Sequence, residues 1–87
     1  MKICFTDEGF DDYNYWVSED KKTLKKINLL IKDIQRNGSK GIGKSKILKY
    51  DFAKCYSKRI NQEHRLVFYI NGNDLIIVSC RTHYKKQ

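Results

Sequence analysis

One long amphipathic helix constrains the fold of this chain more than any other feature. The segment KKTLKKINLLIKDIQRNG, residues 21–38, repeats apolar residues at helical spacing, and lysines occupy most of the other face. Asn37 and Gly38 are typical of a helix end, because glycine accepts the left-handed backbone of a C-cap. In a chain of 87 residues, the surface that this helix covers has to come from the same small domain. The apolar residues on one face are Leu24, Ile27, Leu30, Ile31 and Ile34.

The remaining segments predict one more helix and a small sheet. Residues 6–17, TDEGFDDYNYWV, have helical spacing of aromatic residues, with Thr6 or Asp7 as N-cap, and Ser18 is the expected N-cap of the long helix. The order is a strand, two helices and then four strands joined as hairpins. This predicts the α+β class: a small antiparallel-meander sheet with two N-terminal helices packed on one face, in one domain spanning residues 1–87. The expected strands are 2–5, 47–50, 55–60, 63–70 and 74–81.

The strand faces predict a cluster of basic residues, on a condition about turn length. If the loops at 61–63 and 71–73 each hold three residues, Arg59 lies opposite Arg65, and Arg65 opposite Ser79. Two-residue loops would separate them. Like charges placed opposite each other are unfavourable unless an anion lies between them, and a phosphate is such an anion. The residues expected to share this face are Arg59, Arg65, Arg81 and His83, and Cys80 is expected on the face opposite Leu75 and Ile77.

Charge and cysteine content limit the partners and the compartment. The net charge is +8, and six of the ten acidic residues fall within the first twenty positions, so the chain beyond them is strongly basic. This favours an anionic partner: nucleic acid, an acidic protein or an anionic membrane surface. Cys4, Cys55 and Cys80 match no zinc spacing, which predicts free thiols in a reducing compartment. With no apolar run of membrane-spanning length and an acidic N-terminal segment, we expect a cytoplasmic protein.

Several stretches resemble one family of bacterial toxins. DDYNYW, KKINLLIKDI, LKYD, YSKRINQEHRLVFYI and the closing CRTHY are similar to the YoeB/Txe family, within the RelE/ParE superfamily, over residues 1–84. The resemblance implies a small sheet with helices on one side. It also implies a toxin that enters the ribosomal A site, cuts mRNA there and is neutralised by a Phd/YefM-type antitoxin. Homodimerisation is left open.

The resemblance also implies which residues carry the chemistry. RNA is cut when its 2′-hydroxyl attacks the adjacent phosphate, which needs a base, cations for the phosphorane and an acid, but no metal or cofactor. Arg65 suits the phosphate, His83 suits proton transfer near neutral pH, and Tyr84 suits stacking on a base. Glu63 is expected to orient an arginine. The expected phosphate-contacting cations are Arg59, Arg81, Lys44 and Lys49.

One position departs from the family. Lys46 stands where the family has its general-base glutamate. Lys46 acts as a neutral base, or His83 takes that role, or the chain is a weak enzyme that works as a ribosome- or antitoxin-binding module. A ParE-like inhibitor of DNA gyrase is a further alternative, and the terminal His83–Tyr84 pair argues against it. His64 is expected to be an exposed or packing residue.

Overall fold

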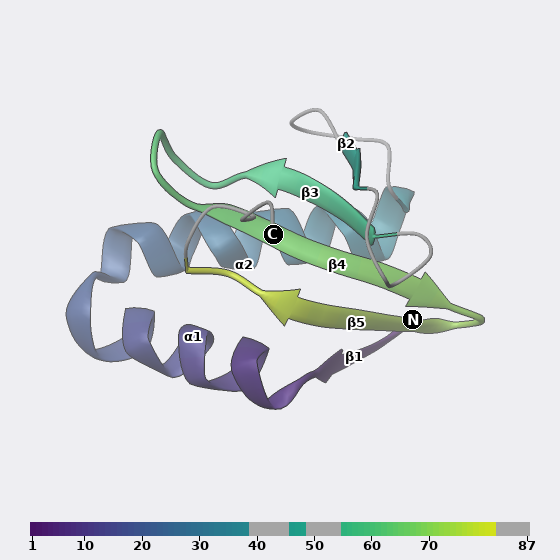
Figure 1. Ribbon diagram of the computed structural model, residues 1–87, viewed down its shortest axis with the longest axis horizontal. Coiled ribbons are helices and arrows are strands. Elements are labelled where there is room, and N and C mark those ends of the chain that lie inside the picture. The colour runs from purple at the N-terminus through teal and green to yellow at the C-terminus, as the bar shows by residue number, and fades with distance from the viewer. Residues whose placement is uncertain (39–45, 49–54, 82–87) are drawn as a thin grey trace.

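The computed structural model describes residues 1–38 and 55–81, together with the backbone of residues 46–48. These residues form a five-stranded sheet in the order β1-β5-β4-β3-β2 with two helices (Figure 1). The elements are β1 (Lys2–Phe5), α1 (Asp7–Glu19), α2 (Lys21–Asn37), β2 (Lys46–Leu48), β3 (Cys55–Arg59), β4 (Arg65–Asn71) and β5 (Asp74–Ser79).

The α+β class and the two N-terminal helices are confirmed, but the sheet is mixed. Strands β2 to β5 form the predicted antiparallel meander, whereas β1 pairs with β5 in parallel. Lys2 lies opposite Asp74, so both strands start at the end of the sheet that carries the β4–β5 turn. The predicted meander did not include the parallel pairing of β1, because its partner strand lies some seventy residues away in the chain and no local pattern indicates it.

Both helices cover the same face of the sheet. Helix α2 passes behind the strands, and α1 follows the β5 side (Figure 1). Trp16 of α1 and the predicted apolar stripe of α2 pack against Leu66 and Phe68 of β4 and Leu75 and Ile77 of β5. Burial of this continuous cluster is the main stabilising contribution to the fold.

The helix caps are partly as predicted. Thr6 caps α1 by accepting a hydrogen bond from the Gly9 amide at 3.0 Å. The expected cap of α2 at Ser18 is wrong, because the Ser18 hydroxyl donates to the Asn14 carbonyl inside α1. Asp20 is the cap instead, since its carboxylate accepts from the amides of Lys22 and Thr23.

The two hairpin turns differ in length, which decides the register. Arg59 lies directly opposite Arg65, as the three-residue loop predicts. The β4–β5 turn holds two residues, because Asn71 pairs with Asp74 and Gly72 takes a positive φ of 62°.

The predicted partner of Arg65 on β5 and the predicted face of Cys80 are therefore wrong. Ser79 lies opposite Val67, and a register shift falls between Val67 and Phe68. Cys80 is fully buried in the cluster that also contains Leu75 and Ile77, while Val78 packs on the other face. An extra residue at the shift breaks the strict alternation from which the prediction was made.

Candidate functional site

Two arginines face each other where β3 and β4 meet their turn. Arg59 ends β3 and Arg65 begins β4, in register. Arg59 is exposed and Arg65 partly buried, and no acidic side chain pairs with either arginine among the described residues. Like charges at opposed positions repel each other, so this end of the sheet favours an anion.

The Arg65 guanidinium is held by two backbone carbonyls. Its Nη1 group donates to the Asn61 oxygen at 2.9 Å and to the His64 oxygen at 3.1 Å. Glu63 was expected to orient an arginine, but its carboxylate lies 3.8 Å from Nε2 of His64 and contacts no arginine that the structure describes. The carbonyls of the turn therefore have the orienting role that the sequence assigned to Glu63.

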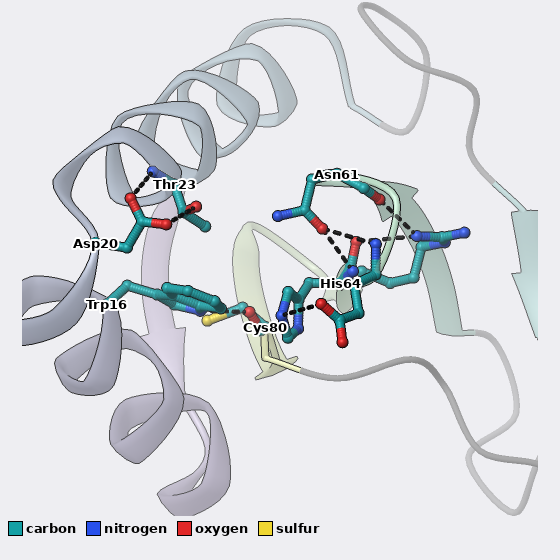
Figure 2. Close-up of polar contacts among 8 residues, drawn as sticks. Trp16, Asp20, Thr23, Asn61, His64 and Cys80 are labelled. Atoms are coloured by element: carbon teal, nitrogen blue, oxygen red, sulfur yellow. Dashed lines mark hydrogen bonds and ion pairs between the residues drawn. The ribbon is translucent and has the colours of Figure 1, made fainter.

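The β3–β4 turn is fixed by Asn61. The side-chain oxygen of Asn61 accepts from the Glu63 amide at 2.9 Å and from the His64 amide at 2.8 Å (Figure 2). This is an Asx turn, in which an asparagine side chain replaces a backbone carbonyl. The amides of Ile60 and Asn61 donate in turn to the His64 carbonyl.

Trp16 joins this turn to the end of β5. The ring of His64 meets the Trp16 ring edge to face, with centroids 4.8 Å apart, and the indole Nε1 donates to the Cys80 carbonyl at 2.8 Å (Figure 2). Nδ1 of His64 is buried and makes no hydrogen bond with any residue that the structure describes. The structure thus shows His64 as a packing residue, one of the two roles expected for it.

Helix α1 also holds the residues that follow β5. The Asp12 carboxylate accepts from the Cys80 amide at 2.9 Å, and the Arg81 guanidinium lies 3.6 Å from the centre of the Tyr15 ring, a cation–π contact. Burial, and to a lesser extent the Asp12 carboxylate, raise the pKa of the Cys80 thiol to about 12. Cys80 is therefore a protonated packing residue.

His83 and Tyr84, which follow this segment, lie outside the described residues, as do Lys44 and Lys49.

Lys46 is placed by its backbone register. It begins β2 opposite Ser57, and Ser57 lies opposite Val67. The Arg59–Arg65 pair is two residues further along the same two strands. Lys46 therefore lies two residue positions along the sheet from the arginine pair, on the strand that neighbours β3.

Two grooves lined by described residues lie away from the arginine pair. One groove, of about 430 Å³, runs between β1 and α2, and the other, of about 470 Å³, lies along α2. Among the described residues, no group of three or more histidine, cysteine or acidic side chains is arranged to hold a metal ion. No described helix is long and apolar enough to span a membrane. The candidate site among the described residues is thus the basic end of the sheet that carries Arg59 and Arg65, which suits an anion.

Four residues of this arrangement were not predicted as site residues. They contact and position other residues of the candidate site or of its neighbouring turn, and none of them is expected to bind the anion. These residues are Asn61, Asp12, Tyr15 and Trp16. Only Asn61 has a local signal, because asparagine at the start of a short loop favours an Asx turn. The α1 contacts join residues more than sixty positions apart, which no local pattern reveals.

Comparison with known proteins identifies the class to which this fold and basic sheet end belong. Residues 5–84 match the family described as YoeB-like toxin of bacterial type II toxin-antitoxin system. The chain is 51% identical to Toxin YoeB of Synechocystis over 86 residues, which is 99% of this chain and all of that toxin. It belongs to the YoeB-like toxin family, as the resemblance predicted.

Solved structures agree with this assignment. The YoeB dimer from Staphylococcus aureus is 48% identical, has a TM-score of 0.89, and the match covers 97% of this chain and 98% of that one. The YoeB–YefM complex from the same organism is 47% identical with a TM-score of 0.87, at the same coverage.

Proposed function

We propose that this toxin is a ribosome-dependent endoribonuclease that cuts mRNA in the A site. The 2′-hydroxyl oxygen attacks the adjacent phosphorus, the 5′-oxygen of the next nucleotide leaves, and a 2′,3′-cyclic phosphate remains. The observation that carries the proposal is the opposed pair Arg59 and Arg65, which has no acidic partner among the described residues. A scissile phosphate between them would relieve their repulsion and gain charge stabilisation in the transition state.

Each residue of the proposed site has one task. Arg65 offers a planar fork of N–H donors to the phosphate oxygens, and Arg59 supplies a second positive charge. His83 moves a proton, because imidazole titrates near neutral pH. Tyr84 stacks on a base, and Arg81, held against Tyr15, contacts the backbone next to the cut. Lys44 and Lys49 are further backbone contacts.

Lys46 decides how strong an enzyme this is. Its register position, two residues along the sheet from the arginine pair, supports a role near the phosphate. A cationic Lys46 would stabilise the phosphorane and leave His83 to move both protons, whereas a neutral Lys46 would be the base itself. The alternative function, a weakly active toxin that binds the ribosome or antitoxin, rests on this same residue.

The basic surface also supports an acidic protein partner. The YoeB–YefM complex shows that a related toxin binds YefM, and the S. aureus YoeB dimer shows self-association of that relative. We propose a Phd/YefM-type antitoxin for this chain, with a segment that orders on binding, and homodimerisation as a further assembly. Capture of the toxin from its native cells should recover a small acidic protein. Recovery of ribosomes without any such protein, under every growth condition, would contradict this part of the proposal.

The function is tested by primer extension on mRNA translated in a cell-free system. We expect cuts only in translated mRNA, and much weaker cuts in the Arg65→Ala variant. Lys26→Ala, which removes a cation from the outer face of α2, is the matched control and should cut like the parent. Altered supercoiling without any cut would instead favour a gyrase inhibitor, and equal cutting of translated and naked RNA would contradict ribosome dependence.

A further inference from the structure

We infer that Asn61 is a positioning residue, which fixes the Arg65 guanidinium so that one chosen edge of it faces the RNA phosphate. The inference rests on the proposed role of Arg65 as phosphate ligand. It adds a residue that bears no charge and is not expected to touch RNA.

The first step is the hydrogen-bonding of the turn. Asn61 uses one side-chain oxygen to accept from two successive amides, those of Glu63 and His64. These bonds bend the chain so that the carbonyls of Asn61 and His64 both point at Nη1 of Arg65. Without the side-chain oxygen, two amides lose their acceptor and the turn can open.

The second step concerns the donors that remain on Arg65. An arginine has five N–H donors, and Nη1 carries two of them. Two carbonyls at 2.9 and 3.1 Å occupy Nη1. Nε and Nη2 have no acceptor among the described residues, and these two nitrogens form a planar edge that takes two oxygens of one phosphate. The turn therefore determines which edge of the guanidinium is available.

The third step is the anchoring of the turn to the core. His64, at the other end of the Asn61 hydrogen bonds, has a side chain only 16% exposed and packs on the buried Trp16 ring. The turn is thus held at one end by the core and at the other by Asn61. Asn61 is exposed, so its replacement removes the turn bonds without disturbing the core, whereas replacement of Trp16 would disturb both.

The test compares three variants in single-turnover cleavage on programmed ribosomes with saturating toxin. Asn61→Ala should cut about 10- to 100-fold more slowly, because a small misplacement of a positioned group has costs of this order. Asn61→Asp keeps an oxygen acceptor for the two amides and should recover most of the rate. Asn73→Ala changes an exposed asparagine of the other hairpin turn and should cut like the parent.

A double-mutant cycle shows whether Asn61 acts through Arg65. Arg65→Ala should still cut slowly but measurably over long reaction times. In this background Asn61→Ala should have no further effect on the rate, because there is no guanidinium left to position. Amide hydrogen exchange of Glu63 and His64 should speed up in Asn61→Ala, and should stay slow in Asn61→Asp. Equal rates for parent and Asn61→Ala, or additive losses in the double variant, overturn the inference and leave the proposed function standing if Arg65→Ala is slow. A fast Arg65→Ala variant overturns both.

Discussion

At the scale of single residues, Lys46 separates two kinds of chemistry. A carboxylate at this position accepts a proton, whereas a lysine does so only if nearby cations such as Arg59 and Arg65 keep it neutral. The register places Lys46 two residue positions along the sheet from these arginines, on the neighbouring strand.

Substitution of Lys46 distinguishes the roles. If Lys46 is the base, Lys46→Ala should slow single-turnover cleavage by about 10²- to 10⁴-fold, the usual contribution of general acid–base catalysis. If the chain is a weakened enzyme, Lys46→Glu should cut faster than the parent. His83→Ala should abolish cleavage in both cases. Parent-like rates in all three variants would show that neither residue belongs to the catalytic site.

The three cysteines make a second prediction at this scale. Burial raises the pKa of the Cys55 thiol, and burial with Asp12 raises the pKa of Cys80 to about 12. A thiol reacts as its thiolate, so both should be inert at pH 8 in the folded protein. Titration with a thiol reagent should count one reactive group, Cys4, in native protein and all three in denaturant. Fast reaction of more than one native thiol would contradict the packing described for the core.

At the scale of elements, α1 depends on a close approach to β5. A Cβ on Gly9 would overlap the carbonyl oxygen of Ile77 and lie 3.3 Å from the Thr6 hydroxyl oxygen. Gly9→Ala, which would stabilise an isolated helix by about 1 kcal/mol, should therefore lower the free energy of unfolding, by about 1–3 kcal/mol. Urea unfolding measures this, with exposed Asn14→Ala of the same helix as control. A stabilised Gly9→Ala variant would mean that α1 does not pack on β5 this closely.

The start of α2 predicts a dependence on pH. Hydrogen bonds from the side chain and amide of Thr23 are the main reason that the pKa of Asp20 is lowered. A carboxylate with a lower pKa in the folded state stabilises the protein above its unfolded pKa, and the stabilisation is lost as pH falls through the folded pKa.

Substitution by asparagine isolates this effect. Asp20→Asn keeps a capping oxygen but cannot titrate, so its Tm should lie below that of the parent at pH 6. The difference should shrink as pH is lowered from about 4 to 2, below the model-peptide pKa of Asp. Thermal unfolding across this range is the measurement, and a difference independent of pH would contradict the role of the ionised cap.

Sequence patterns predicted those elements whose signals are local. Periodicity predicted α2 almost to the residue, whereas the Arg59–Arg65 pair was predicted only on the condition of a three-residue loop after β3, which the register confirms. The partner of Ser79 was missed because a register shift is a property of two strands together. The contacts of Trp16 with His64 and Cys80 were missed because they depend on packing between distant segments.

At the scale of the whole molecule, acidic and basic residues are separated along the chain. Most acidic residues lie in or beside α1, while the arginines of the candidate site lie at the sheet end that β3, β4 and the residues after β5 share. Helix α1 is joined to that end through Trp16, Asp12 and Tyr15. The molecule is thus arranged to present cations on a surface that is held by its own acidic helix.

The most direct test of the proposed function is to move the A site and follow the cut. Ribosomes are programmed with one mRNA and stalled at either of two adjacent codons, and the cleavage site is mapped after addition of the toxin. A ribosome-positioned nuclease predicts a cut in the A-site codon that shifts by one codon with the ribosome, and a much weaker cut with Arg65→Ala. A cut that stays at the same nucleotides in both complexes, or in naked RNA, would contradict the proposal.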